Sequence, residues 1–363
     1  MQSRQERAGP VPASAIRALI ADALAAAGLP RADAELCAEL MTEADLTGFD
    51  AHGVFRLPQY VRRLRAGGFN PSPEIRVTRS AASTALVDGD NGMGHLVMKR
   101  AADTAVAIAR ETGVAWVGAR RSNHAGPAGT YAAMPAAQDM VGLYAAVANA
   151  NHMAVWGGAE PLLGTNPLAI GLPSGAGPVV LDMATTVVSY GTIKTHALND
   201  RPLPEGWMVD TRTGAPITDA KRSDDGLLLP IGGYKGSGLA IMLGLIAGTL
   251  NGAAFGRDVV DFNADDASAT NTGHFIVALD VARFLPLARF TAEVDRQLAE
   301  LKGSQRLPGV DAIRLPGDRR RDCRAERWRD GVPLAPALVA RLDRLAAELG
   351  IAPLAQRSDQ IAR

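Results

Sequence analysis

The chain has 363 residues, of which 47% are hydrophobic and 21% are charged, so it can form about two to three domains with a large core and is not a disordered protein. Lys plus Arg and Asp plus Glu balance at 38 each, which removes the overall charge that attracts nucleic acid or an anionic membrane. Cys37 and Cys323 are isolated, which excludes a disulfide framework and a thiolate metal site, and no apolar targeting segment follows the first charged residues, so we expect a cytoplasmic protein with a small-molecule partner.

The first part of the chain has a helical pattern. Apolar residues recur at helical spacing from Ile16 to Leu24. Further helices are expected over residues 31–46 and up to about Ala66. The turn sequence Gly-Gly-Phe-Asn-Pro-Ser-Pro follows. We therefore predict a helical N-terminal unit over residues 1–73.

Short runs of β-type residues begin after this turn. Several are joined by loops with no room for a crossover helix, so the sheet must be mixed or largely antiparallel. The sequence also lacks G-x-G-x-x-G and G-x-x-x-x-G-K-[ST], the glycine patterns of the common nucleotide-binding folds. We therefore predict an α/β (α+β-like) domain over residues 74–285 with a mixed, non-Rossmann sheet. The expected strands are residues 74–78, 84–88, 113–118, 141–147, 167–172, 178–183 and 274–280, with helices over 94–112 and 127–138.

Beyond residue 186 the pattern changes again. A short helix to about His196 and a stretch rich in Pro and Gly precede an apolar segment, residues 239–255. We interpret this segment as a buried core helix, because it is short for a membrane span and contains Thr249 and Asn251. Further helices are expected over residues 288–302 and 335–349, the charged run 319–330 is interpreted as a solvated face, and residues after Pro353 are expected to fray.

A histidine and an arginine lie four residues apart in D-A-H-G-V-F-R. His52 could exchange a proton near neutral pH, because the imidazole pKa is about 6.5. Arg56 could bind a planar carboxylate through two hydrogen bonds. On a helix both side chains would point the same way, although Pro58 favours a helix that begins at Leu57. The spacing alone also fits a structural histidine beside a surface arginine.

Six motifs occur in order between about residue 50 and residue 318: D-A-H-G-V-F-R-L-P-Q-Y, S-N-H-A-G-P-A-G, G-G-A-E-P-L-L-G-T-N-P, L-D-M-A-T-T, G-Y-K-G-S-G-L-A and L-P-G-D. Together they resemble the malate/L-lactate dehydrogenase-type (L-sulfolactate dehydrogenase-like) family of NAD(P)-dependent oxidoreductases. The resemblance implies a mixed sheet that binds NAD or NADP without a metal. It also implies a returning C-terminal segment, residues 286–363, packed with the N-terminal helices, and a homodimer.

The implied reaction is hydride transfer between nicotinamide and a small 2-hydroxy or 2-oxo carboxylic acid of the malate, lactate or ureidoglycolate type. In this family the position of His52 is catalytic. The positions of Arg56 and Thr165 contact the substrate. The cofactor-binding positions match His124, Gly126, Asp182, Met183, Ala184, Lys235, Gly317 and Arg319.

Three of these residues have a structural alternative. His124 could be an ordinary turn histidine, Asp182 could be a buried structural cap at a strand end, and Lys235 could be a loop lysine that faces solvent. For Lys235, a place before a helix N-terminus would also suit a phosphate or ribose contact.

The chain departs from the family where polar residues are usual. Ala51 stands where most members have Ser, and Ala148-Asn149-Ala150 stands where many have Thr-Asn-Ser. Imine-reducing members have an Asp at the position that aligns with Thr192. These changes count against the first alternative function, an NADPH-dependent reductase of cyclic imino acids. They also motivate a second alternative, a cofactor-binding protein that has lost its activity.

Overall fold

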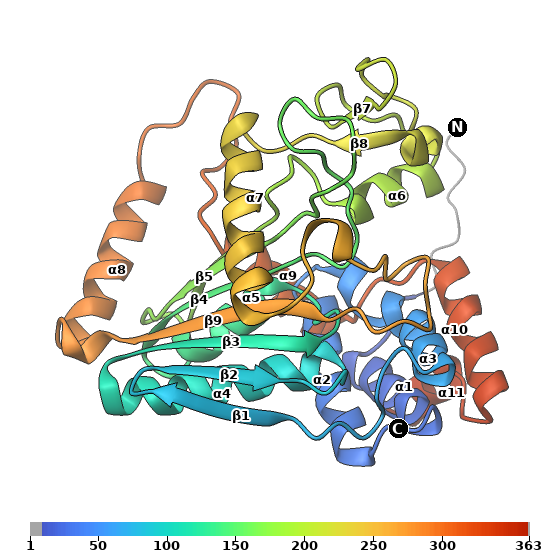
Figure 1. Cartoon of the computed structure of the whole chain (residues 1–363), viewed down its shortest axis with the longest axis horizontal. Helices are drawn as coiled ribbons and strands as arrows, with labels where there is room; N and C mark the ends of the chain where they lie inside the picture. Colours follow the sequence, from blue (N-terminus) through green and yellow to red (C-terminus); the bar gives the residue numbers. More distant parts are fainter. Residues whose placement is uncertain (1–8, 362–363) are drawn as a thin grey trace.

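A computed structural model describes residues 9–361. Its centre is a seven-stranded sheet in the order β1-β2-β3-β9-β4-β5-β6 (Figure 1). Of these neighbours, only β2 and β3 run parallel, which confirms the predicted mixed, non-Rossmann sheet. The strands are β1 Arg76–Ala81, β2 Thr84–Asp88, β3 Val114–Ser122, β4 Met140–Ala146, β5 Leu168–Leu172, β6 Val179–Met183 and β9 Thr272–Asp280; β7 Met208–Asp210 and β8 Gly226–Leu228 form a separate pair.

Helices cover both faces of the sheet. On one face, α4 (Gly94–Thr112) and α5 (Ala128–Ala136) pack on strand residues such as Val117. The next residue along β3, Trp116, points to the other face, where α7 (Tyr234–Ala247) packs. Glycines let α5 approach closely, because a Cβ atom at Gly142 would lie 2.2 Å from the Ala132 carbonyl oxygen.

The N-terminal and C-terminal helices share one hydrophobic core, as the family resemblance implied. Its members include Leu19 of α1, Tyr60 of α3, and Leu342 and Ala346 of α10. The domain limits at residues 73 and 286 remain predictions, and residues 1–8 and 362–363 lie outside the described chain. The helices are α1 Ala13–Ala26, α2 Arg31–Leu46, α3 Leu57–Ala66 with Pro58 in its first turn, α6 Tyr190–Leu198, α8 Leu287–Lys302, α9 Asp318–Asp330, α10 Pro336–Leu349 and α11 Leu354–Ile361.

The charged run 319–330 lies in helix α9 and is mainly exposed, as expected, but part of it packs on the N-terminal helices: Arg324 Nε lies 3.0 Å from Glu43, and Arg327 Nη1 binds the Asp45 carbonyl oxygen. The expectation that the chain frays after Pro353 is wrong for residues 354–361, which form α11, and Leu354 at its start is buried. Both helices depend on contacts with the N-terminal helices, which a local sequence pattern does not show.

The apolar segment 239–255 is also not a buried core helix throughout. Helix α7 begins at Tyr234 and ends at Ala247, so it includes only the first part of the segment. Leu243 packs on the sheet, but Met242 and Leu245 remain 56% and 40% exposed. Within residues 9–361, no helix is long and apolar enough to cross a membrane.

A loop that we call the strap, residues 261–268, is held by side chains of α3. Gln59 Nε2 donates to the Phe262 carbonyl oxygen at 2.7 Å, and Arg62 pairs with Asp266 at 2.8 Å. The fully buried Arg63 donates to carbonyl oxygens of the strap, at 2.6 Å for Ser268, and its guanidinium lies 4.8 Å from the ring centre of Phe262. One helix therefore fixes the position of the strap.

We expect Arg63→Met to lower the free energy of unfolding by about 3 kcal/mol, because it leaves buried carbonyl groups without donors. Arg62→Met is the matched control. Its ion pair is partly exposed, so we expect a loss below about 1 kcal/mol. Thermal and denaturant unfolding of the two variants measure the difference, and equal losses would contradict the role given to Arg63.

Candidate functional site

The sequence motifs meet at one edge of the sheet. In the pairing register, Ser122 at the end of β3 lies opposite Thr272 at the start of β9, and Ala146 at the end of β4 lies opposite His274. Leu168 at the start of β5 lies opposite Met183 at the end of β6. The loops that follow β3, β4 and β6 and precede β5 and β9 therefore leave the same edge.

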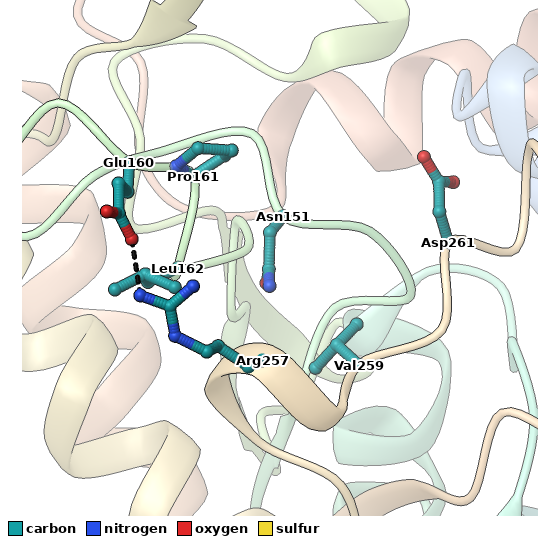
Figure 2. Close-up of a pocket in the computed structure, with 7 residues that line it drawn as sticks. All are labelled: Asn151, Glu160, Pro161, Leu162, Arg257, Val259 and Asp261. Carbon is teal, nitrogen blue, oxygen red and sulfur yellow. Dashed lines mark hydrogen bonds and ion pairs between the residues drawn. The ribbon is translucent and has the colours of Figure 1, made fainter.

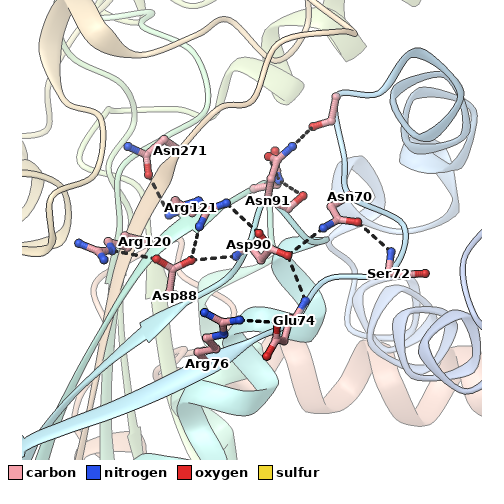
Figure 3. Close-up of polar contacts among 12 residues, drawn as sticks. Asn70, Ser72, Glu74, Arg76, Asp88, Asp90, Asn91, Arg120, Arg121 and Asn271 are labelled. Carbon is pink, nitrogen blue, oxygen red and sulfur yellow. Dashed lines mark hydrogen bonds and ion pairs between the residues drawn. The ribbon is translucent and has the colours of Figure 1, made fainter.

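A polar cluster fixes the loop after β3 (Figure 3). Arg121 pairs with Asp88 at 3.1 Å and with Asp90 at 2.8 Å. The buried Asn123 donates to the Asn91 side chain at 3.0 Å, and its own oxygen accepts a hydrogen bond from Thr270. These contacts hold the backbone immediately before His124.

A broken turn carries His52 and Arg56. Residues 50–52 and 54–56 form two short 3-10 turns separated by Gly53, so the two side chains do not share a regular helix. The buried Asp45 carboxylate accepts the Val54 N–H at 2.8 Å. A Cβ atom at Gly53 would lie 2.0 Å from this carboxylate, so only glycine can take that position.

Arg56 is a partly buried cation without a carboxylate partner among the described residues. Its guanidinium donates to the Ala51 carbonyl oxygen at 2.9 Å, to Gln59 at 2.8 Å and to Asn263 at 3.1 Å, all of which are neutral acceptors. Burial is the main cause that lowers the pKa of Arg56. An arginine in this state is ready to bind an anion.

His52 and His124 stack with ring centres 5.4 Å apart, and Phe262 stacks on the other side of the site against His124 at 5.4 Å. Tyr60 Oη lies 2.6 Å from His124 Nδ1. Burial lowers the pKa of His52 to about 3 and holds the pKa of His124 well below its usual value. Burial also raises the pKa of Tyr60. All three groups are therefore neutral at pH 7.

His95, in the first turn of α4, was not singled out in the sequence. It is 1% exposed, and neither ring nitrogen has a hydrogen-bond partner among the described residues. Burial lowers its pKa to about 4. Its Nε2 lies under Gly126, which has a φ of 81° and where a Cβ atom would lie 3.2 Å from that nitrogen. Buried polar atoms without partners here fit a ligand beside this loop.

Asp182 lies at the end of β6 and accepts the Gly129 N–H at 2.7 Å at the start of α5. Asp182 therefore does make the kind of hydrogen bond that the structural alternative, a cap, requires. Burial raises the pKa of Asp182 to about 6, while this hydrogen bond and Arg320 act in the opposite direction. A Cβ atom at Gly129 would lie 2.8 Å from Arg320 Nη1 and 2.9 Å from Asp182, so both charged side chains lie directly against this glycine.

The arginine that faces Asp182 is Arg320, whereas Arg319 is exposed. Arg320 Nη1 is buried and has no partner among the described residues. Gly317 lies against β6, because a Cβ atom there would be 3.1 Å from the Val180 nitrogen. The structure thus brings Gly317 close to the strand that carries Asp182 and Met183, and it places Arg320, the second arginine of the expected cofactor loop, beside Asp182 in place of Arg319.

The other predicted positions lie around the same edge. The Thr165 carbonyl oxygen accepts both the N–H and the hydroxyl of Thr185 at 2.9 Å. Ala184 directly follows β6 and is half-buried. Lys235 lies in the first turn of α7, where it is exposed and has no polar partner among the described residues. Lys235 therefore lies as expected for a lysine that faces solvent.

The wall opposite His52 comes from α6. A Cβ atom at Gly191 would lie 2.9 Å from Ala51, so this helix packs on the turn. The Thr192 hydroxyl lies 3.0 Å from Ser189, within its own helix cap. His152 stacks on Tyr190 with ring centres 3.8 Å apart. No hydrogen bond links the His52 ring to another described residue, so no carboxylate relay acts on it.

The site therefore combines the Arg56 guanidinium, which has no carboxylate partner among the described residues, with the neutral imidazoles of His52 and His124. Such a set of groups suits an enzyme that binds a small carboxylic acid and transfers a proton. Among residues 9–361, no group of three or more His, Cys, Asp or Glu side chains is placed to hold a metal ion.

Comparison with known proteins gives the family. The malate/L-lactate dehydrogenase family matches residues 11–343, so the chain belongs to this family. It is 34% identical to malate dehydrogenase of Pyrococcus horikoshii over 94% of this chain and 96% of the relative. It is 35% identical to L-sulfolactate dehydrogenase of Methanocaldococcus jannaschii over 92% of this chain and 95% of the relative. These relatives identify an oxidoreductase of the 2-hydroxy-acid dehydrogenase class.

Solved structures agree with this assignment. The malate dehydrogenase of Pyrococcus horikoshii superposes with a TM-score of 0.87 at 33% identity, over 95% of this chain and 96% of the other. The delta1-piperideine-2-carboxylate reductase of Pseudomonas syringae superposes with a TM-score of 0.80 at 30% identity, over 93% of this chain and its whole length.

Proposed function

We propose that the protein oxidises a small 2-hydroxy acid, or reduces the 2-oxo acid, with a nicotinamide cofactor. The observation that carries this proposal is Arg56, a partly buried cation that among the described residues is bonded only to neutral groups and lies beside His52 and His124. It would bind the substrate carboxylate, with Thr165 at the other side of the site. When bound, the cofactor accepts or supplies the hydride at C2.

The cofactor would lie along the edge of the sheet, against the residues that the sequence assigns to it. Gly126 and Gly129 let His95, Asp182 and Arg320 approach the loop after β3 closely, and the polar atoms of His95 and Arg320 that have no partner among the described residues could bind the cofactor. Relatives of this chain include a ureidoglycolate dehydrogenase that uses NAD(+) and a (2R)-3-sulfolactate dehydrogenase that uses NADP(+). The ratio of kcat/KM with NAD to kcat/KM with NADP measures which cofactor this protein prefers.

Two histidines are placed to handle the proton, and we assign this role to His124 ahead of His52. In the tautomer that donates Nδ1–H to Tyr60, the Nε2 atom of His124 is free to accept the hydroxyl proton of the substrate. His52 has no such orienting partner. It would support His124 by stacking and by excluding water.

We expect purified protein to reduce NAD or NADP with a panel that includes malate, lactate and ureidoglycolate. Arg56→Ala should raise KM for these acids at least tenfold, because it removes the cation for the carboxylate. Absorbance at 340 nm follows the reaction. Cyclic imines in the reverse assay test the alternative of imine reduction, which is disfavoured by Thr192; turnover of imines alone would overturn our proposal. Cofactor binding without any turnover would support the inactive alternative.

His124→Ala should lower kcat by about 100-fold or more, because general acid–base groups contribute at this level. His52→Ala should have a smaller effect on kcat and should leave cofactor affinity near that of the wild type, whereas His124→Ala should also weaken cofactor binding. Steady-state kinetics and cofactor titration give the two values. A larger loss of kcat in His52→Ala than in His124→Ala would show that His52, and not His124, transfers the proton.

We also propose that the protein works in a reducing compartment, because its two cysteines, Cys37 and Cys323, are both free.

We further propose that the protein is a homodimer. An apolar patch on and around α7 supports the dimer. Its members are large and exposed, and Trp156 lies over the first turn of the helix at Gly233. Helix α8, at the margin of Figure 1, has no fully buried residue although it is amphipathic. The patch consists of Val155, Trp156, Tyr234, Met242, Leu245 and Leu250.

We expect the double variant Met242→Glu and Leu245→Glu to be monomeric, because two charges would be buried in the interface. Trp328→Glu is a control on α9, outside this patch and 68% exposed. Analytical ultracentrifugation at several concentrations gives the oligomeric state. A wild type that stays monomeric, or a double variant that stays dimeric, would show that the patch is not the interface.

A further inference from the structure

A cavity of about 500 Å³ lies between two loops of the chain (Figure 2). One wall is the loop from Asn151 to Leu162, and the other is the segment from Arg257 to Asp261 at the start of the strap. Sequence reasoning assigned no role to any of these residues. The lining residues are Asn151, Glu160, Pro161, Leu162, Arg257, Val259 and Asp261.

Asp261 connects this cavity to the reacting groups. The next residue, Phe262, stacks on His124, and the one after it, Asn263, binds Arg56. Asp261 Oδ1 accepts the backbone N–H of Asn263 at 2.8 Å. A molecule whose carboxylate is held by Arg56 therefore has its other end within reach of this cavity.

The unused hydrogen-bonding groups of the cavity are acceptors. The Asn151 side-chain oxygen is buried and has no donor among the described residues, while its nitrogen donates to the Gly256 carbonyl oxygen at 2.8 Å. The Asp261 carboxylate has no basic partner in the described chain, because its hydrogen bonds come from the backbone and side chain of Asn263. The one cation of the lining, Arg257, is paired with Glu160 at 2.5 Å.

We propose that this cavity receives the end of the substrate away from the carboxylate, and that it selects an uncharged donor such as an amide or ureido group over a second carboxylate or sulfonate. The proposal rests on the proposed function. A donor would satisfy the Asn151 oxygen, which otherwise stays unpaired, and would add to the hydrogen bonds that Asp261 accepts from Asn263. A second anion would face the negative charge of Asp261, which has no basic partner among the described residues, and like charges repel each other. Asn151 and Asp261 are thus the specificity-determining residues.

The test compares malate with its distal monoamide, which has the same shape but an uncharged donor in place of the second carboxylate. We expect the intact protein to have a kcat/KM for the monoamide about tenfold or more above that for malate. Asp261→Asn should reduce this ratio about tenfold, since it removes the charge but keeps an acceptor for Asn263. Asn151→Ala should lower kcat/KM mainly for the monoamide. Asp258→Asn, on the same segment but outside the lining, should leave the ratio unchanged.

Several results would overturn the proposal. These are a preference for malate, an unchanged ratio in Asp261→Asn, or a loss of malate activity alone in Arg257→Gln, which would mean that Arg257 binds a second anion. If neither compound reacts while other 2-hydroxy acids do, the cavity does not hold the distal group. If no 2-hydroxy acid reacts with NAD or NADP, the proposed function itself is wrong, and the cavity proposal is wrong with it.

Discussion

The insertion of β9 between β3 and β4 is the constraint on which the rest of the molecule depends. This strand comes late in the chain, yet it pairs antiparallel with two central strands and completes the sheet. Because it enters at the edge where β3, β4 and β6 end, the strap that precedes it is delivered to the same place. The substrate-binding groups of the N-terminal turn and the loops of the sheet can therefore meet over one short edge.

The electrostatics of this edge follow from burial. Burial lowers the pKa of His52, His95 and His124, so the three imidazoles are neutral and Arg56 is left as the cation that a substrate meets first. Only neutral oxygens contact its guanidinium, and an anion gains most from such a partner because it replaces no existing ion pair. Neutral imidazoles next to a fixed cation also suit a reaction in which a hydroxyl group loses its proton.

Local features were predictable from the sequence, and long-range ones were not. Loop lengths between β4, β5 and β6 indicated a mixed sheet, and Arg56 and His124 stand in recognisable motifs. The position of β9 depends on pairing between distant segments, so no local pattern contains it. Helix α9 has charged residues in place of an apolar stripe, and contacts with α2 support it. Asn263 carries no motif, and the loop that contains Arg319 and Arg320 does not show which arginine faces Asp182, so both contacts are visible only once the chain has folded.

Arg327 of α9 donates to the Asp45 carbonyl oxygen and pairs with Asp50, next to the turn that holds His52. This contact has a consequence for biosynthesis. The N-terminal helices leave the ribosome first, but the turn lacks one of its supports until residue 327 has been made, and the strap and β9 also arrive late. The active site therefore cannot form domain by domain during translation, and a chain released before α9 would carry every motif of the site without its final geometry.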